Sequence, residues 1–135
     1  MTFVDTSALY ALLDGTDRNH ATARNQWIGL LDAEETLVTT NYVVVETVAL
    51  VQNRLGMDAV RTLLDDILDL MEIRFVDADL YRAAEAALLA AGQRRLSLVD
   101  CASFQIMRDL GIAAAFAFDR HYKDRGFRLV DDSRL

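Results

Sequence analysis

The sequence contains no proline, only one cysteine and no long apolar segment. The single cysteine, Cys101, cannot form a disulfide within the chain, which is typical of proteins from a reducing compartment, so we expect a cytoplasmic protein. The longer apolar segments, such as residues 112–118, are far shorter than the roughly 20 residues that span a bilayer. No basic leader precedes the first predicted strand, so neither a secretory signal nor membrane association is expected.

Linkers, repeats and common nucleotide-binding patterns are also absent. The chain has no Gly/Ser-rich or low-complexity tract and no internal repeat, so residues 1–135 are expected to form a single domain. Neither the phosphate-binding pattern GxxxxGK(S/T) nor the dinucleotide-binding pattern GxGxxG occurs, which argues against the folds that use them.

Positive charge is scarce. The chain has 14 basic residues, all but one of them arginine, against 21 acidic residues, and its net charge is −7. This balance is unusual for a nucleic-acid binder, because phosphate contacts need local positive charge. Arginine nevertheless suits bidentate pairing with phosphate or carboxylate. Part of the negative charge can also belong to a cluster that holds cations, so composition leaves nucleic-acid binding open.

Segments with strand and helix patterns alternate along the chain. Five short β-forming segments are predicted, at residues 2–4, 36–40, 72–76, 112–118 and 127–130. Helical patterns are predicted at residues 8–13, 18–31 with Asp17 as the cap, 41–55, 57–71, from Asp77 or Asp79 to 92, and 97–111. The fourth strand is the most apolar and is expected at the centre of the sheet, with the fifth at an edge. This alternation predicts an α/β fold with a mainly parallel sheet flanked by helices.

Residues 41–51 carry two conflicting signals. Their β-branched side chains favour a strand by propensity. Their apolar side chains, however, recur at intervals of three and four, and Gly56 follows as a typical C-terminal cap. We predict a helix that begins at Thr40 or Asn41, which places Glu46 near its amino-terminal end.

Four acidic residues fall at the boundaries where an α/β fold places its ligand site. Asp5 and Asp119 end predicted strands, while Glu46 and Asp100 lie in the first turns of predicted helices. If the first and fourth strands are neighbours, Asp5 and Asp119 face one crevice. Crowded carboxylates repel one another, and Mg²⁺ or Mn²⁺ with oxygen ligands offsets that repulsion. Such an ion can activate water and stabilise a displacement at phosphorus.

Each of these acids also has a simpler interpretation. Asp5 and Asp119 can cap the helical turns that follow them, and Ser97 with Asp100 fits a capping box. Glu46 can be an ordinary surface residue. Taken together, the acids from different elements at one end of one sheet favour a metal site over four unrelated caps.

The chain resembles the PIN-domain nucleases, and within them the small bacterial VapC-type toxins of toxin–antitoxin pairs. The resemblance extends over essentially the whole chain and lies in a set of short motifs in order: Val4-Asp5-Thr6-Ser7, Thr40-Asn41 followed by Glu46, Leu96-Ser97-Leu98-Val99-Asp100, Phe118-Asp119, and Gly126-Phe127.

This resemblance implies a Mg²⁺- or Mn²⁺-dependent endoribonuclease that acts as the toxin of a type II toxin–antitoxin system. It implies that Asp5, Glu46, Asp100 and Asp119 are the catalytic and metal-binding residues, and that Ser7 supports them by hydrogen bonding. It further implies a PIN-like three-layer fold, an RNA substrate, a homodimer and a small antitoxin that blocks the site.

Basic residues flank two of the four acids: Arg94 and Arg95 before Asp100, and Arg120 and Lys123 after Asp119. They are candidate contacts to an RNA backbone, although solvated loops with such residues are common. His20 and His121 have no Cys or His at ligand spacing, so surface or structural roles are expected for both. Cys101 and Trp27 are expected to pack in the core.

Two other functions use similar features. Phosphoryl-transfer proteins also place an Asp at a strand end, but the haloacid-dehalogenase type has a second Asp where this chain has Ser7, and the response-regulator type needs a late Lys, for which Lys123 is poorly placed. A PIN-like domain kept only for binding partners, without activity, is the second alternative.

Overall fold

The computed structural model describes residues 1–130, in which five strands form one sheet in the order β3-β2-β1-β4-β5. All neighbouring strands are parallel. The strands are β1 (Thr2–Val4), β2 (Leu37–Thr40), β3 (Glu72–Arg74), β4 (Ala114–Phe116) and β5 (Arg128–Leu129). The prediction of an α/β fold with a mainly parallel sheet of about five strands is confirmed.

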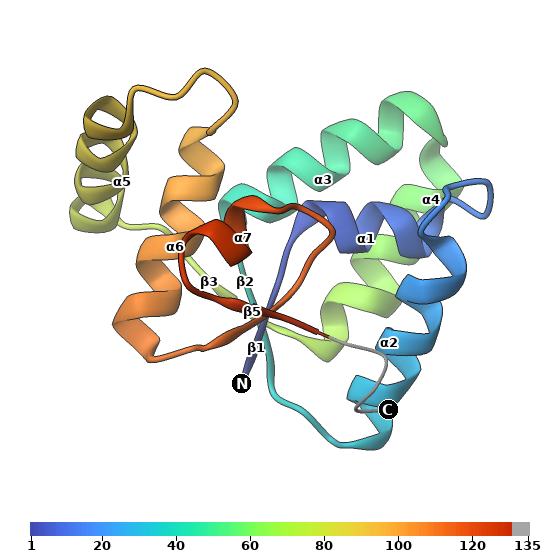
Figure 1. Ribbon diagram of the computed structural model, residues 1–135. Coiled ribbons are helices and arrows are strands. Elements are labelled where there is room, and N and C mark those ends of the chain that lie inside the picture. The colour runs from blue at the N-terminus through green and yellow to red at the C-terminus, as the bar shows by residue number, and fades with distance from the viewer. Residues whose placement is uncertain (131–135) are drawn as a thin grey trace.

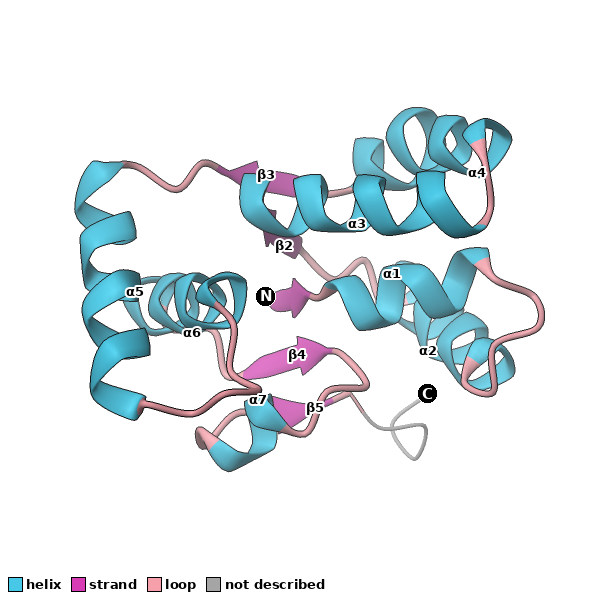
Figure 2. Cartoon of the chain, turned by 90° about the horizontal axis from the view of Figure 1, so that it is seen from above, coloured by secondary structure: helices cyan, strands magenta, loops and turns pink. Residues whose placement is uncertain are grey.

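Helices cover both faces of the sheet and make the fold three-layered (Figure 1). They are α1 (Thr6–Leu13), α2 (His20–Asp32), α3 (Asn41–Arg54), α4 (Met57–Arg61), α5 (Ala78–Ala91), α6 (Leu98–Leu110) and α7 (His121–Asp124). Seen from above, α5 and α6 lie on one side of the strands and α1 to α4 on the other (Figure 2). In the part of the chain that the structure describes, no helix is long and apolar enough to cross a membrane.

Most predicted helix ends are confirmed, because caps depend on residues close in sequence. Residues 41–54 are helical, and the Thr40 hydroxyl accepts a hydrogen bond from the Val43 amide at 3.2 Å. Asp77 caps α5. Gly92 and Gly111 end α5 and α6 in the left-handed conformation that glycine adopts without a steric penalty.

The prediction that Asp17 caps a helix from residue 18 is wrong by two residues. Helix α2 begins at His20, and Asp17 instead closes the preceding turn, where its side chain accepts a hydrogen bond from the Asn19 amide at 2.8 Å. Both arrangements use the same preference of Asp for nearby backbone amides, so the residue type alone does not separate them.

The single helix predicted over residues 57–71 is also wrong. After α4 the backbone widens into a π-helix at Thr62–Ile67 and then tightens into a 3₁₀ turn at Leu68–Leu70. Leu63 and Leu68 are five residues apart and both buried, whereas Leu64 is 45% exposed. In a π-helix the hydrogen bonds join residues five apart, so Leu63 and Leu68 lie nearer to the same side of the helix. In a regular α-helix, with 3.6 residues per turn, two residues five apart point in more different directions.

The central strand of the sheet is β1, not the fourth strand as predicted. Strand β1 pairs with β2 on one side and β4 on the other, and its three residues are all buried. Strand β5 lies at an edge, as expected. The chain builds the sheet from β1 to β3 in one direction and then returns to add β4 on the other side of β1. This reversal is a topological switch point, where open α/β sheets place their ligand sites.

The fourth strand is shorter than predicted. It occupies only Ala114–Phe116. At its end the Phe118 amide donates to the Ser7 hydroxyl at 2.9 Å, so the chain leaves the sheet toward α1. As expected, Cys101 is buried, and Trp27 has a packing role: it is partly buried against the core, where its ring stacks on Phe116 at 6.2 Å between centroids.

Candidate active site

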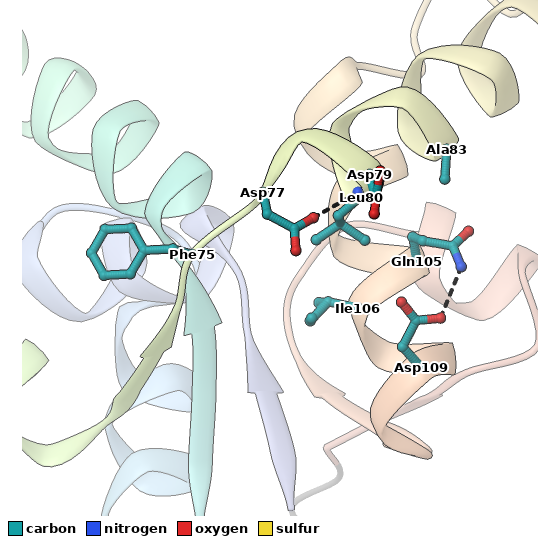
Figure 3. A pocket seen from close by; sticks show the side chains of 8 residues that line it. All are labelled: Phe75, Asp77, Asp79, Leu80, Ala83, Gln105, Ile106 and Asp109. Carbon is teal, nitrogen blue, oxygen red and sulfur yellow. Dashed lines mark hydrogen bonds between the residues drawn. The ribbon is translucent and has the colours of Figure 1, made fainter.

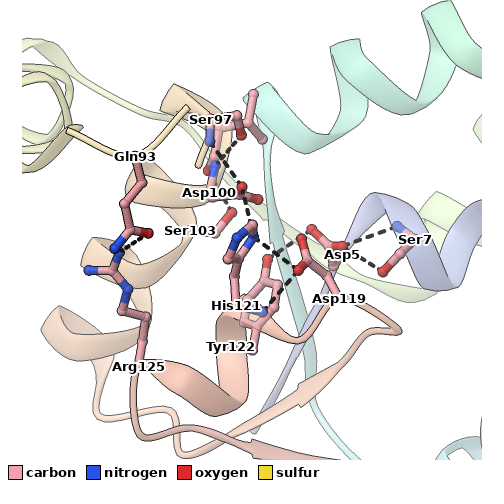
Figure 4. A network of polar contacts seen from close by, with 11 residues as sticks. Asp5, Ser7, Gln93, Ser97, Asp100, Ser103, Asp119, His121, Tyr122 and Arg125 are labelled. Carbon is pink, nitrogen blue, oxygen red and sulfur yellow. Dashed lines mark hydrogen bonds and ion pairs between the residues drawn. The ribbon is translucent and has the colours of Figure 1, made fainter. Parts of the chain in front are cut away.

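Asp5 lies at the switch point, directly after β1, and is 4% exposed. Its Oδ2 accepts hydrogen bonds from the Ser7 amide at 3.1 Å and the Ser7 hydroxyl at 2.7 Å. Its Oδ1 accepts one from the Tyr122 hydroxyl at 2.8 Å (Figure 4). Burial raises the pKa of Asp5, and these hydrogen bonds oppose the rise without cancelling it. The carboxylate is therefore held in one orientation at an electrostatic cost.

Tyr122 is a site residue that the sequence analysis missed. It is fully buried among Phe3 and Phe104, yet its hydroxyl reaches Asp5, 117 positions away in the chain. Burial raises the pKa of the Tyr122 phenol well above its usual range, so the hydroxyl remains a hydrogen-bond donor. No local sequence pattern predicts this contact, because its two residues are far apart in the chain. A Tyr in a short helix is usually only a packing residue.

Asp100 has both of the roles considered for it. It forms a capping box with Ser97: the Asp100 amide donates to the Ser97 hydroxyl at 3.0 Å, and the Ser97 amide donates to Asp100 Oδ2 at 3.1 Å. The same carboxylate lies near Asp5 and Asp119 (Figure 4), so burial raises its pKa and the charges of those two acids raise it further. The cap thus orients Asp100 toward the switch point.

Glu46 approaches from α3, on the other side of the site. That helix is tied to α1 by the buried Thr6 and Thr47 hydroxyls, which are 2.9 Å apart. Glu46 is exposed, yet partial desolvation of its carboxylate raises its pKa, and the charges of Asp5, Asp100 and Asp119 add to the rise. Ligand atoms of Asp100 and Asp119 lie within 4.8 Å of each other, Asp5 lies beside Asp119 (Figure 4), and Glu46 is near enough for the charges of these three acids to act on it.

Asp119 lies in the loop after β4 and accepts a hydrogen bond from the His121 amide at 2.9 Å. The His121 ring lies between two acids, with Nδ1 3.0 Å from Asp119 Oδ1 and 3.7 Å from Asp100 Oδ2. His121 therefore lies among the candidate site residues, although no Cys or His occurs at ligand spacing from it in the sequence. The spacing Asp-x-His across the start of α7 was the available signal. His20 does have a structural contact, between Nδ1 and the Ala11 carbonyl at 2.7 Å.

A model of the family described as PIN domain matches residues 2–128 of this chain. The chain belongs to the PIN-domain family. A curated relative, the 23S rRNA-specific endonuclease VapC20 of Mycobacterium tuberculosis, is 35% identical over 128 residues, which are 94% of this chain and 95% of the relative.

Solved structures agree with this assignment. The crystal structure of Mycobacterium tuberculosis VapC20, described there as a sarcin–ricin loop cleaving toxin, matches this chain with a TM-score of 0.82 and 34% identity over 94% of this chain and 96% of that one. FitAcB from Neisseria gonorrhoeae matches with a TM-score of 0.67 and 16% identity over the full length of both chains, which shows a shared fold.

The four basic residues that flank the acids of this PIN domain are exposed: Arg94, Arg95, Arg120 and Lys123. Within residues 1–130, none of them forms an ion pair with an acidic side chain. A further arginine, Arg125, has partners within the protein: it donates to the Gln93 side chain at 3.4 Å (Figure 4). Its guanidinium also lies over the Phe104 ring. The flanking residues are thus free to contact a polyanion.

The hollows on the surface of residues 1–130 include two of interest. One, of about 410 Å³, borders the acidic cluster and is lined by Asn41, Tyr42, Val45, Glu46, Leu98 and Val99. The other, of about 270 Å³, lies between Phe75, the start of α5 and the end of α6, and contains none of the four acids (Figure 3). Of these two hollows, the first shares Glu46 with the candidate active site.

Ser7→Ala is expected to lower cleavage activity by on the order of tenfold to a hundredfold, because the Ser7 hydroxyl joins Asp5 to the loop that carries Asp119. Its loss also leaves the Phe118 amide without a partner, which costs about 1–3 kcal/mol of stability. Both quantities are measured, as kcat/KM on RNA and as the free energy of unfolding in urea.

Thr16→Ala is the matched control for this variant. Thr16 makes the same pair of contacts to Asp14 that Ser7 makes to Asp5, from its amide and its hydroxyl, but in an exposed turn before α2. Its activity should equal that of the wild type, and Ser7→Thr should recover most of the activity lost in Ser7→Ala. Full activity in Ser7→Ala would show that this hydroxyl does not position Asp5.

Proposed function

We propose that this PIN domain is a divalent-cation-dependent endoribonuclease and the toxin of a type II toxin–antitoxin pair. The observation that carries the proposal is the convergence of Asp5, Glu46, Asp100 and Asp119, delivered by four separate elements to the switch point of the sheet. The resemblance to a 23S rRNA-specific endonuclease over nearly the whole chain supports it.

The residues of the cluster fit a divalent cation. Desolvation and mutual repulsion raise the pKa values of Asp5, Glu46 and Asp100, so these carboxylates repel one another at neutral pH unless a cation offsets their charge. Carboxylate oxygens are the ligands that Mg²⁺ and Mn²⁺ prefer. When bound, such an ion supplies Lewis-acid stabilisation of the charge that develops during phosphodiester hydrolysis, and it favours deprotonation of water.

The protein's own residues perform the positioning. Ser7 and Tyr122 hold both oxygens of Asp5, the capping box holds Asp100, and the His121 amide holds Asp119. Because these contacts exist before substrate arrives, the acids need little reorganisation on binding. The basic residues on the rim of the site then hold the RNA backbone against the acids.

The proposed substrate is a structured RNA, because the similar protein from Mycobacterium tuberculosis is named for 23S rRNA and described as cleaving the sarcin–ricin loop. An antitoxin that covers the acids would silence the enzyme in the cell. We also propose a homodimer and a cytoplasmic location, where ribosomal RNA is found.

The test is cleavage of purified 23S rRNA and of a sarcin–ricin loop hairpin by the wild-type protein in Mg²⁺ or Mn²⁺. We expect cuts at one or a few sites in both substrates, and no cuts with Asp119→Asn. Metal binding without any RNA cleavage would favour the inactive binding module. Release of phosphate from small phosphoesters, with RNA intact, would favour the phosphoryl-transfer alternative.

The double variant Arg94→Gln/Arg95→Gln is expected to weaken RNA binding roughly tenfold, because two phosphate contacts are lost. The dependence of log Kd on log salt concentration should become shallower by about 0.7 for each contact to single-stranded RNA. Binding is measured by fluorescence anisotropy in EDTA, so that cleavage does not interfere.

Arg18→Gln/Arg24→Gln is the control for that experiment. Both residues are exposed, and their replacement changes the net charge by the same amount as the first double variant. Arg18 lies between α1 and α2 and Arg24 lies within α2, whereas Asp5 caps the opposite end of α1. Equal weakening by both double variants would mean that only overall charge matters, and Arg94 and Arg95 would then have no special place on the RNA.

A further inference from the structure

The ring nitrogen of His121 has an unusual environment. Nδ1 is buried, lies 3.0 Å from Asp119 Oδ1 and 3.7 Å from Asp100 Oδ2, and forms no hydrogen bond. The short distance to Asp119 without a hydrogen bond means that the ring N–H does not point at the oxygen. If Nδ1 carries no proton, its lone pair takes that same direction and meets no donor, while two carboxylates lie close by (Figure 4). Neither arrangement satisfies the nitrogen.

A cation between the three groups would satisfy all of them. One oxygen of Asp100, one of Asp119 and the His121 nitrogen lie within 4.8 Å of one another. Two adjacent ligands on an octahedral ion, with bonds of about 2.1 Å, are about 3 Å apart, and two opposite ligands are about 4.2 Å apart. The His121 to Asp119 distance of 3.0 Å matches adjacent ligands, and the 3.7 Å to Asp100 lies between the two cases.

The local backbone keeps this arrangement together. The His121 amide donates to the same Asp119 Oδ1 that its own ring approaches. The two side chains therefore move as one unit at the start of α7, while the capping box holds Asp100 on the facing helix.

We propose that His121 is a nitrogen ligand of the divalent cation and makes the site prefer Mn²⁺ over Mg²⁺. This inference rests on the proposed function, since it concerns the same cation. Mg²⁺ prefers oxygen ligands and gains little from an imidazole, whereas transition-metal ions accept imidazole readily. A site with one nitrogen among carboxylates therefore discriminates between the two ions in a way that an all-oxygen site does not.

The experiment is electron spin echo spectroscopy of Mn²⁺ bound to the metal-free protein. The described chain holds both histidines of the sequence, His20 and His121, so an imidazole ¹⁴N coupling has only two sources. We expect the coupling in the wild type and in His20→Gln, and its loss in His121→Gln. Calorimetric titration should show the Mn²⁺ Kd of His121→Gln raised roughly tenfold or more, with a much smaller change for Mg²⁺.

Each other outcome has a defined meaning. Mn²⁺ bound to the wild type without a ¹⁴N coupling overturns the inference and leaves the proposed nuclease function untouched, because RNA cleavage is measured separately. Equal losses of Mn²⁺ and Mg²⁺ affinity in His121→Gln overturn the preference. Absence of binding by either ion overturns both proposals. Should His121→Gln fail to fold, the wild-type and His20→Gln spectra still decide.

Discussion

Removal of divalent cations with EDTA is expected to abolish RNA cleavage by this PIN domain, with a loss of at least about a thousandfold. The acids at the switch point carry charge of one sign, so without a cation they repel a phosphate instead of stabilising the charge that develops on it. Addition of Mn²⁺ or Mg²⁺ in excess of the chelator should restore cleavage. Undiminished cleavage in EDTA, with cyclic phosphate ends, would contradict the metal mechanism.

The metal-free protein should also become more stable as the pH falls from neutral toward about 5. The pKa values of Asp5, Glu46 and Asp100 are raised in the folded state, so the folded chain binds protons more readily than the unfolded chain in this range. Each of these groups therefore destabilises the fold above its folded pKa, and the penalty disappears as the pH falls through that value toward the ordinary one near 4.

Two other carboxylates, Asp14 and Glu35, affect the pH dependence of stability in the opposite direction and at lower pH. The pKa values of Asp14 and Glu35 are lowered by hydrogen bonds, to Thr16 and to the chain's amino terminus respectively, so the stability they contribute is lost only as the pH falls below about 4. Melting temperatures at pH 5 and pH 7.5, with EDTA and with Mn²⁺, test the prediction. A metal-free protein that melts higher at pH 7.5 than at pH 5 would contradict it, and Mn²⁺ should raise the Tm most at pH 7.5.

Asp5→Asn is expected to lower kcat/KM by on the order of a thousandfold while the metal-free protein melts no lower than the wild type. The amide keeps the shape of the carboxylate: its oxygen can still accept from Ser7, and its NH₂ can donate to the Tyr122 oxygen. The substitution removes one buried charge from the repelling cluster, which favours the metal-free fold.

Asp17→Asn is the matched control for Asp5→Asn. Asp17 accepts a hydrogen bond from the amide two residues later, as Asp5 does, but in the turn before α2. Its activity should remain that of the wild type. If Asp5→Asn instead lost activity together with a clear drop in Tm, the main role of Asp5 would be to cap α1 rather than to hold a cation.

The local features of this chain were readable from its sequence. Thr40, Asp77 and Ser97 cap the helices for which they were predicted, because a cap depends on a side chain and an amide two or three residues away. The alternation of strands and helices follows from hydrophobic periodicity, and this alternation predicted that four acids lie at the same end of a parallel sheet.

Features that depend on distant packing were not readable. The π-helix at Thr62–Ile67 arises because Leu63 and Leu68 must face one core, and the position of β1 at the centre follows from the order of the strands. The contact between Tyr122 and Asp5 could not be predicted from local patterns, because the two residues are 117 positions apart. A surface or structural role was predicted for His121 because no Cys or His lies at ligand spacing, whereas the groups near its ring are carboxylates, one of them Asp100 from α6.

The sequence by itself thus determined the class of fold and the identity of the four acids, since both depend on residue types at local boundaries. Only the tertiary structure decided how each acid is held, and that a histidine lies among them. Those features depend on side chains from β1, α6 and α7 that meet only because β4 is added beside β1, where the chain reverses the direction in which it builds the sheet.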